Sequence, residues 1–419
     1  MRPTEQSPVN VHVLVDLEWS AQAGGHVKCW ERFAEAAINV PDLNLTVHFS
    51  GEASQRRQLS SSVTFEIHEP VFSTRRIPFM GHVPDHTDLG LFHPELARKL
   101  MKADVIHTTD AYFAFAKTAE RLSKEMMMPL VHSVHTDSVA YSELFTRKML
   151  DERFNILKLN RILIDELRVP QRVSQGMRAK LEKHLRLCTH VLTSREEDHA
   201  VAARVVAPAR LSHLRLGIDR DVFKPERSNR QKLNQKYHIP ADAMVIVFVG
   251  RLDEGKNIYV LINAVERAIR EGLPVFLIAA GIGPAAEVIE RVLHGHAVCV
   301  GFMPPHELAE VYASADFMAL PSHVETWSMV AAEAMTCGLP VIAAAQSGVG
   351  RFIGDSHAGE LVHENSAVAW AEVLHQANQF VGDNTLRENA LHLADEHFPT
   401  WQQALEQDLL PVWQSVRKI

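Results

Sequence analysis

The feature that most constrains the fold is a repeated alternation of short apolar runs with amphipathic helical segments. In the first half of the chain, helical segments at about 26–38 and 114–124 follow apolar runs. Apolar strands that alternate with helices form βαβ units, in which helices cover both faces of a parallel sheet. The pattern therefore predicts an α/β domain with strands at 11–15, 104–107, 130–134 and 190–193.

The same alternation begins again after residue 240. A helix is expected at 258–271, because Gly272 and Pro274 end the amphipathic run there. The intervening stretch 216–229, LGIDRDVFKPERSN, is rich in turn formers and charge, as linkers between domains are. A chain of 419 residues also exceeds the ~100–200 residues of one typical domain. We therefore predict a second α/β domain, with strands at 244–249, 275–279, 298–300, 317–320 and 341–343.

Composition argues against several classes of protein. The net charge of −8 disfavours general nucleic-acid binding, which needs a basic surface. No run approaches the ~18 apolar residues that cross a bilayer, and the N-terminus lacks the basic flank and apolar core of a signal peptide. Without a Cys-x-x-Cys pair, we expect neither a zinc site nor disulfides, but reduced thiols in a cytoplasmic protein. The four cysteines are Cys29, Cys188, Cys299 and Cys337.

One segment, 146–186, differs from the rest in charge. It contains eleven Lys or Arg and five Asp or Glu, a net charge of +6, and apolar residues lie among them. A basic amphipathic helix can lie on an anionic lipid surface. A helix that packs on the core and keeps its charges in solvent shows the same pattern. The segment therefore leaves peripheral membrane contact open.

The stretch 320–341, LPSHVETWSMVAAEAMTCGLPV, carries two glutamates eight positions apart. Glu325 is expected in the turn after a strand, and Glu333 about two turns into the helix that begins near Ser328. The N-terminus of a helix is a natural phosphate site, and a carboxylate there could accept hydrogen bonds from ribose hydroxyls. A helix with an exposed glutamate would have the same sequence, so this motif alone leaves both interpretations open.

The stretch 250–257, GRLDEGKN, directly follows a predicted strand. Arg251 and Lys256 would share one short loop at the carboxyl end of the sheet, where open α/β sheets bind ligands. Such cations could hold a diphosphate, arginine through a bidentate fork and lysine as a point charge, and could stabilise it as it departs. Two solvated surface cations are the alternative interpretation.

Gly24 and Gly25 follow the first strand and precede a helix. Glycines let a backbone approach a ligand closely, and the helix that follows presents free N–H groups. This strand is not followed by a GxGxxG fingerprint, and the chain has no Walker-type phosphate loop. An NAD-dependent oxidoreductase or an ATPase therefore loses its main support.

Two histidines, His132 and His135, occur in the stretch VHSVHTD at the end of a predicted strand. A histidine at that position could hydrogen-bond a sugar hydroxyl or orient a reacting centre. Their spacing is not that of helical metal ligands, and no cluster of carboxylates accompanies them. A structural histidine is the alternative.

These motifs together resemble those of the retaining glycosyltransferases of the GT-B fold, family 4 (glycosyl transferases group 1). ETWSMVAAE resembles the family's glutamate–seven residues–glutamate motif, and GRLDEGKN resembles its diphosphate loop. The resemblance covers nearly the whole chain and is dense over 189–362. It implies two Rossmann-like domains that face each other across a cleft. These would be an acceptor-side domain at 1–215, a nucleotide-sugar domain at 216–395, and a C-terminal helix at 396–419 that returns to the first domain.

The resemblance implies roles for the matching residues. His135 would contact the donor sugar near its reactive carbon, Arg251 and Lys256 would grip the diphosphate, Glu325 would hold sugar hydroxyls, and Glu333 would bind the ribose. The other implied donor-binding positions are Gly24 and Gly25 beside the phosphates, Gly283 in the GIGP turn, Phe302 near the base, and Trp327, Ser328 and Met329 through their backbone N–H groups.

Two departures from the family's pattern stand out. Phe-Gly often follows the first glutamate, whereas Trp327 and Ser328 stand here, and the added side chain could crowd the sugar. The family's Asn-Gly-Val-Asp turn into the second domain reads Leu-Gly-Ile-Asp at 216–219. The first departure concerns which sugar is transferred.

The expected function is transfer of a hexose from a UDP- or GDP-linked sugar to an acceptor hydroxyl, with retention and without a metal or other cofactor. Asp219 and Asp221 have an Asp-x-Asp spacing but lie in the turn between the domains. The acceptor, a glycan, a lipid-linked sugar or a small molecule, would be read by the first domain, including 72–91 and 146–186. A nucleotide-sugar epimerase of the same fold and a non-catalytic nucleotide-sugar-binding protein are the alternatives.

Overall fold

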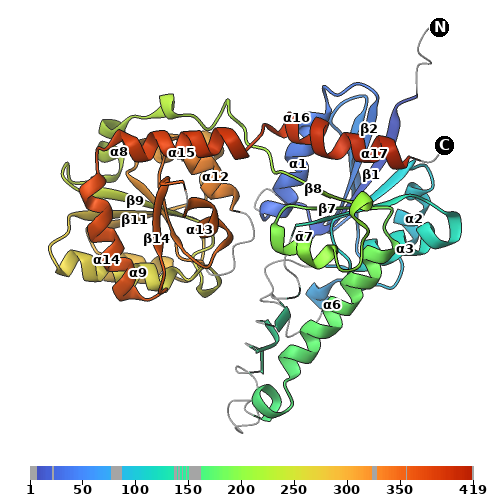
Figure 1. Ribbon diagram of the computed structural model, residues 1–419, viewed down its shortest axis with the longest axis horizontal. Coiled ribbons are helices and arrows are strands. Elements are labelled where there is room, and N and C mark those ends of the chain that lie inside the picture. Colours follow the sequence, from blue (N-terminus) through green and yellow to red (C-terminus); the bar gives the residue numbers. More distant parts are fainter. Residues whose placement is uncertain are drawn as a thin grey trace. The chain divides into compact units, whose positions relative to one another are not determined.

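The computed structural model forms two compact units, each with its own parallel sheet (Figure 1). Unit 1 consists of Met1–Arg215 and Trp401–Ile419, and unit 2 of Leu216–Thr400. The residues that the structure describes are 7–20, 23–76, 87–135, 139, 142, 143, 145–147, 149, 150, 162–322, 328–354 and 356–417.

The sheet of unit 1 has eight strands in the order β3-β4-β2-β1-β5-β6-β7-β8. Only the edge strand β3 is antiparallel to its neighbour, and all other pairs are parallel. The strands are β1 Val9–Glu18, β2 Leu43–Ser50, β3 Gln55–Gln58, β4 Val63–His68, β5 Val105–Thr108, β6 Leu130–Val134, β7 His190–Thr193 and β8 Leu211–His213.

Helices cover both faces of this sheet. On one face, α2 (Pro94–Leu100), α3 (Ala114–Met126) and the C-terminal end of α6 (Val169–Leu187) share a buried core with β1, β5, β6 and β7. On the other face, α1 (Gly25–Ala37) packs on β1 and β2. A short helix, α7 (Glu196–Ala202), lies beside β7 and β8.

The end of the chain belongs to unit 1. The helices α16 (Trp401–Ala404) and α17 (Leu410–Val416), with a π-helical turn between them, pack beside α1 and β1. Trp401 packs edge-on against Phe33 at 4.9 Å between ring centroids. Arg215 binds both carboxylate oxygens of Asp408, at 2.7 and 3.1 Å. This ion pair binds the segment 401–419 to Arg215, the last residue of the segment 1–215.

The sheet of unit 2 has six parallel strands in the order β11-β10-β9-β12-β13-β14. The strands are β9 Met244–Val249, β10 Val275–Ala280, β11 Ala297–Gly301, β12 Phe317–Leu320, β13 Val341–Ala344 and β14 Gly359–Val362. One face carries α9 (Ile258–Arg270), α10 (Ala286–Val292) and α14 (Ala367–Ala377). The other carries α8 (Arg230–Tyr237), α11 (Pro305–Ser314), α12 (Met329–Thr336) and α15 (Asn384–His397). A short helix, α13 (Gly348–Ile353), follows β13.

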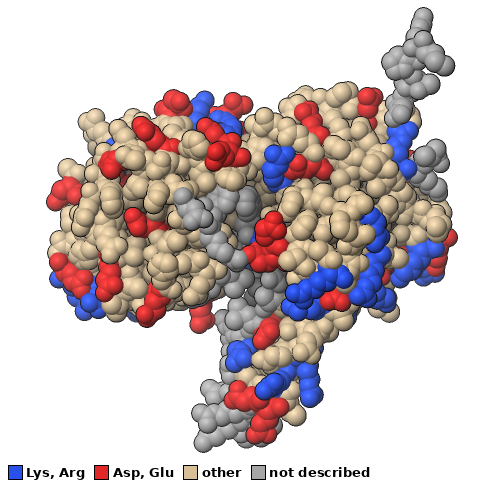
Figure 2. Space-filling model, viewed as in Figure 1, with Lys and Arg blue, Asp and Glu red and all other residues tan. Residues whose placement is uncertain are grey.

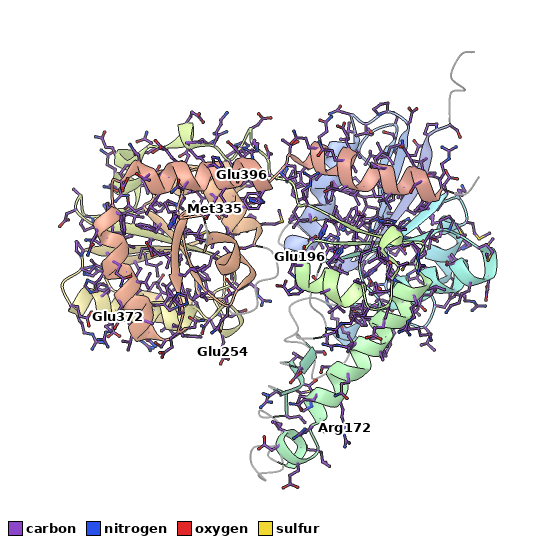
Figure 3. All side chains as sticks on the ribbon, viewed as in Figure 1. Arg172, Glu196, Glu254, Met335, Glu372 and Glu396 are labelled. Atoms are coloured by element: carbon purple, nitrogen blue, oxygen red, sulfur yellow. The ribbon has the colours of Figure 1, made fainter. Side chains whose placement is uncertain are left out.

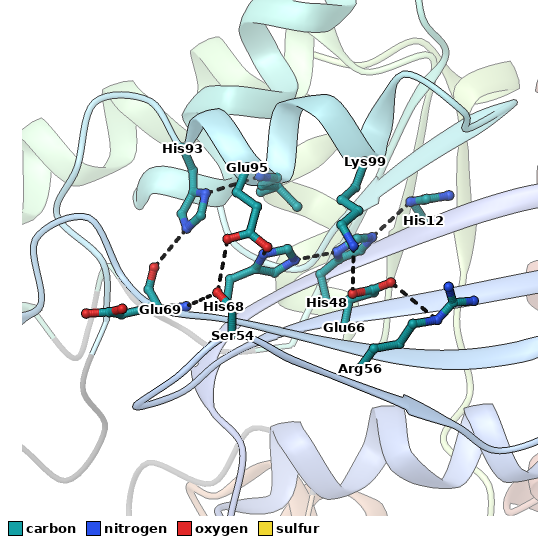
Figure 4. A network of polar contacts seen from close by, with 11 residues as sticks. His12, His48, Ser54, Arg56, Glu66, His68, Glu69, His93, Glu95 and Lys99 are labelled. Carbon is teal, nitrogen blue, oxygen red and sulfur yellow. Dashed lines mark hydrogen bonds and ion pairs between the residues drawn. The ribbon is translucent and has the colours of Figure 1, made fainter.

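The predicted fold class is confirmed, because both units are α/β with parallel sheets. The strands expected at 130–134, 190–193, 244–249 and 317–320 have those bounds in the structure. By contrast, β2 and β4 were not predicted. Their residues on one buried face are polar and interrupt the apolar run, and His48 and His68 there belong to a network of polar contacts (Figure 4).

Candidate active site

In unit 2 the strand order reverses between β9 and β12. From β9 the chain proceeds outward to β10 and β11, and it then returns to β12 on the other side of β9. The carboxyl ends of two such neighbouring strands diverge and leave a crevice where open α/β sheets bind ligands. The described parts of the loops after β9 and β12 hold three of the predicted site residues: Arg251, Lys256 and Ser328.

The loop after β9 holds its two cations in a defined conformation. Arg251 Nε lies 3.1 Å from Asp253 Oδ2, and the Arg251 side chain is 46% exposed. The other oxygen of Asp253 accepts the backbone N–H of Lys256 at 3.2 Å and so caps the short 3₁₀ helix Glu254–Lys256. One carboxylate therefore orients the guanidinium and the turn that carries the ammonium. Glu254 marks this loop in Figure 3.

Asn257 and Asn365 both bind the end of β12. Their side-chain amides donate to the carbonyl oxygen of Pro321, at 3.2 and 2.7 Å. Ser322 Oγ donates to the carbonyl oxygen of Lys256 at 3.4 Å. These bonds connect the β9 and β12 loops directly. Sequence reasoning missed both asparagines. The one signal was the position of Asn257 before a helix, where its left-handed φ of 55° suits asparagine better than most residues.

The helix α12 is the next element along the chain after β12. The Ser328 side chain accepts the N–H of Ala331 and so caps the helix, and no acidic residue occupies the first turn. Met329 is the first helical residue, and Glu333 is half-buried one turn further along. Met335, labelled in Figure 3, is buried in the core. The N-terminus of α12 thus presents backbone N–H groups, with a carboxylate one turn into the helix. Glu325 and Trp327 lie outside the described residues.

Glu333 also affects a buried tyrosine. Burial raises the pKa of the Tyr312 hydroxyl well above its ordinary value, and the charge of Glu333 raises it further. Within the described part of the chain, the Tyr312 hydroxyl has no hydrogen-bond partner. Tyr312 therefore stays neutral and presents no negative charge to the region around Glu333.

Close backbone packing joins the loops after β9 and β10. A Cβ on Gly283 would come under 3.0 Å from the carbonyl oxygen of Leu252, whose N–H donates to Ile282 O at 3.0 Å. The structure thus gives Gly283 a packing role in holding the β9 loop. Phe302, directly after β11, is 60% exposed. The loop ends run in the order of the strands, from Phe302 through Gly283 to Arg251 and Ser328.

The predicted site residues of unit 1 also lie together. Gly24 is the N-cap of α1, which has neither a side-chain cap nor an acidic residue in its first turn. His26, in that turn, stacks on His135 at 4.7 Å between ring centroids. Gly25 has open space where a side chain would be. An uncapped helix N-terminus and the imidazole of His135 therefore share one corner of this unit.

His135 is uncharged, because burial lowers its pKa well below the ordinary value and the neighbouring His26 lowers it further. Its Nε2 lies 2.7 Å from Ser133 Oγ. The other candidate histidine, His132, is buried, and its Nδ1 lies 3.0 Å from Thr108 Oγ1. These contacts are those of a structural histidine for His132, whereas His135 is only half-buried.

The described residues contain no group of three or more His, Cys, Asp or Glu side chains placed to hold a metal ion. None of the described helices has both the length and the apolarity needed to cross a lipid bilayer.

Comparison with known proteins identifies relatives of the chain. Residues 229–389 match the family model described as glycosyl transferases group 1. The D-inositol 3-phosphate glycosyltransferase of Jonesia denitrificans is 30% identical over 345 residues, which cover 78% of this chain and 75% of the relative. With five other curated relatives of the same name, the matched region spans only 42–66% of their length.

Solved structures resemble the chain over nearly its whole length. Sucrose-phosphate synthase from Thermosynechococcus elongatus has a TM-score of 0.70 and 17% identity, and the match covers 97% of this chain and 99% of that one. Anabaena Alr3699/HepE in complex with UDP and glucose has a TM-score of 0.63 and 17% identity, with 96% and 99% covered. The GT-B fold that the sequence predicted is thereby confirmed.

Proposed function

We propose that this chain, which belongs to the glycosyl transferases group 1 family, transfers a hexose from a nucleoside-diphosphate sugar to an acceptor hydroxyl with retention at the anomeric carbon. The observation that carries the proposal is the junction of the β9 and β12 loops at the switch point of unit 2. Asn257 and Ser322 join the two loops there, so the loop that carries both cations is bonded to the end of the strand that precedes α12.

The diphosphate is assigned to this junction. Arg251 and Lys256 supply positive charge, and the N-terminus of α12 supplies N–H groups and the positive end of the helix dipole. Glu333 is assigned to the ribose hydroxyls, because a carboxylate accepts two of them well. We assign the base to the side of Phe302 and Gly283, which follow β11 and β10 and so lie across β9 from Ser328 in the strand order. UDP- and GDP-linked sugars both fit this order.

The assigned groups act on the charge that develops during transfer. The bond between the anomeric carbon and the phosphate oxygen breaks with its electron pair on the phosphate, and the acceptor oxygen bonds to that carbon on the same face. The acceptor proton passes to the departing diphosphate. Arg251 and Lys256 stabilise the negative charge that accumulates there, which is the part of the reaction that fixed positive groups accelerate. We assign the sugar hydroxyls to Glu325, and the donor phosphates also to Gly24 and Gly25.

The test is turnover with a panel of UDP- and GDP-linked hexoses. A thermal-shift screen first identifies the donor, since a ligand that binds only the folded state raises the melting temperature. Lys256→Ala and Glu333→Ala are each expected to abolish transfer and keep the fold. Lys232→Ala is the matched control, because Lys232 is an exposed lysine of the same unit that pairs with Glu310 at 2.7 Å. Near-normal turnover in both site variants would rule out the assigned site.

We further propose that the acceptor side of the enzyme contacts anionic lipid through α6, on the cytoplasmic face of a membrane. Figure 2 shows Lys and Arg side chains along α6 and on the adjoining surface of unit 1. The exposed residues of α6 include Arg172 (labelled in Figure 3), Arg178, Lys180, Lys183 and Arg186, while Glu182 is the one acidic residue of this helix. Residues 148 and 151–161 of the predicted basic segment and residues 77–86 of the predicted acceptor region lie outside the described residues.

Flotation with phosphatidylserine vesicles tests this contact. Each basic residue near such a surface contributes about 1 kcal/mol. Replacing two of them is therefore expected to reduce vesicle binding on the order of tenfold or more. The variant is Lys180→Ala with Lys183→Ala, and the control is Lys232→Ala with Lys236→Ala on α8. Equal binding by both would remove the lipid contact from the proposal.

A further inference from the structure

We infer that Trp413 of the C-terminal helix α17 is a positioning residue that fixes the tautomer of His135 through two buried side chains. Only the identity of the ligand that His135 would bind rests on the proposed function. It assigns His135 the role of a hydrogen-bond donor to the bound sugar or diphosphate, and it excludes His135 as a general base.

Four side chains form a continuous hydrogen-bonded chain within unit 1. Trp413 Nε1 lies 3.0 Å from His107 Nδ1, His107 Nε2 lies 2.7 Å from Ser133 Oγ, and Ser133 Oγ lies 2.7 Å from His135 Nε2. Trp413, His107 and Ser133 are all completely buried. The three links join a helix at the end of the sequence to strands β5 and β6 and then to the candidate site.

The direction of the chain follows from the one group that can only donate. An indole N–H donates and never accepts, so His107 Nδ1 is the acceptor. His107 is neutral, because burial lowers its pKa to about 3, and its single ring proton must therefore be on Nε2. That N–H donates to Ser133 Oγ. Within the described part of the chain, the only acceptor in reach of the Ser133 hydroxyl hydrogen is His135 Nε2.

His135 is thereby held as the tautomer with its proton on Nδ1. Its Nε2 is occupied as an acceptor, its Nδ1 bonds to no described residue, and the residue is half-buried. The stack with His26 and the edge contact with Trp30, at 5.8 Å between centroids, hold the plane of the ring. A neutral imidazole in this state offers an N–H to a ligand and has no lone pair left to take a proton.

The direct test is the tautomer of His135 in the full chain without ligand. Protonated and bare ring nitrogens have well-separated ¹⁵N shifts, so ring-labelled histidine reports the tautomer, with His135→Gln used to assign the signal. In the unchanged protein we expect His107 to carry its proton on Nε2 and His135 on Nδ1. In Trp413→Phe, and in Ser133→Ala, we expect His135 to populate both tautomers.

Turnover gives a second readout. Outer partners that fix a histidine tautomer at metal sites contribute about 10–100-fold, and we expect a roughly tenfold lower kcat in Trp413→Phe and Ser133→Ala with little change in the donor KM. Trp401→Phe is the matched control. It replaces another buried indole of the same C-terminal segment. This indole packs on Phe33 and is not one of the four hydrogen-bonded side chains. It should change neither kcat nor the tautomer.

Two results would overturn the inference. One is a His135 proton on Nε2 in the unchanged protein, and the other is a His135 tautomer that stays fixed on Nδ1 in both Trp413→Phe and Ser133→Ala. Ser133→Ala keeps the test valid if Trp413→Phe does not fold. Because the NMR measurement uses no substrate, failure of the proposed transferase activity would leave this result intact, and failure of the tautomer test would leave the activity intact.

Discussion

Gly250 and Gly281, which directly follow the adjacent strands β9 and β10, pack backbone against backbone. Gly250 N–H donates to Ala280 O at 3.0 Å, and a Cβ on Gly281 would come under 3.0 Å from the carbonyl oxygen of Gly250. Both glycines have a φ of +149°. The loop that carries Arg251 is therefore set by a contact that only glycine at 281 allows.

Gly281→Ala is expected to destabilise the protein more than Gly250→Ala. Both substitutions place a side chain at an unfavourable φ, which costs about 1–3 kcal/mol. Only Gly281→Ala adds a backbone clash, worth a further ~1–3 kcal/mol, because a Cβ at Gly250 meets its nearest neighbour at 3.7 Å. Urea denaturation of the two variants measures the difference. Equal losses of unfolding free energy in the two variants would show that the loops after β9 and β10 can move apart without an energetic cost.

Ser328→Ala is expected to weaken both the fold and donor binding. Loss of an N-cap costs about 1 kcal/mol, and a frayed helix start loses a further ~0.3–1 kcal/mol of anion stabilisation, which corresponds to a roughly two- to fivefold higher donor KM. Ser366→Ala is the control, since Ser366 caps α14 in the same way and bonds Ala369 N at 3.3 Å. The control should lose similar stability with an unchanged KM. A raised KM in both would assign the effect to stability alone.

The two functions of Asp253 can be separated by two substitutions. Asp253→Asn keeps an oxygen that accepts the Lys256 N–H but loses the charge that pairs with Arg251, whereas Asp253→Ala loses both. A cap contributes about 1 kcal/mol, so we expect kcat/KM to be roughly fivefold lower in Asp253→Ala than in Asp253→Asn. Steady-state kinetics with the identified donor measures this ratio. A ratio of one would mean that the cap does not position Lys256.

Both faces of β9 and β12 are apolar, and their continuous apolar runs predicted the correct bounds. β2 and β4 escaped prediction because His48 and His68 are buried polar residues whose partners are set by the register between strands. No local pattern contains that register.

The same limit applies to the candidate site. The cations at 251 and 256 follow a strand that the apolar pattern locates, so their neighbourhood could be predicted. The bonds from Asn257 and Asn365 to Pro321 span 64 and 44 positions along the chain. The link between Trp413 and His107 spans 306. Contacts of this kind depend on the path of the chain between them, which only the folded topology defines.

Acidification is expected to destabilise the protein through the row of histidines His12, His48 and His68 on β1, β2 and β4 (Figure 4). Their ring nitrogens lie 2.9 and 2.8 Å apart. Burial lowers the pKa of His12 and of His68 to about 4, and that of His48 well below the ordinary value. The nearby lysines at 99 and 102 also lower the pKa of His12. Glu95, at 3.7 Å from His68, raises the pKa of that histidine and so opposes the effect of burial.

The direction of this pH dependence follows from proton binding in the unfolded and the folded state. The unfolded chain binds a proton at each histidine below pH ~6.5, whereas the folded protein does not until about pH 4. The contribution of these histidines is therefore complete above pH 6.5 and is lost as the pH falls toward 4. Each contributes a slope of up to ~1.4 kcal/mol per pH unit. Burial raises the pKa of three carboxyl groups, which act in the opposite direction: Asp16, Asp110 and Glu360. Burial lowers the pKa of five further histidines, which act in the same direction as the row: His26, His107, His132, His135 and His190.

Replacement of the central histidine isolates this effect from other titrating groups. His48→Gln should reduce the slope of the unfolding free energy between pH 4.5 and 6.5 by about one proton, or ~1.4 kcal/mol per pH unit. His392→Gln is the control, since His392 is an exposed histidine beside Glu396 at 3.5 Å, and it should leave the slope unchanged. Urea denaturation across this range gives both slopes. Because slopes are compared, a loss of stability in His48→Gln that is constant with pH does not affect the comparison. An unchanged slope in that variant would show that His48 binds its proton as readily in the folded state as in the unfolded state.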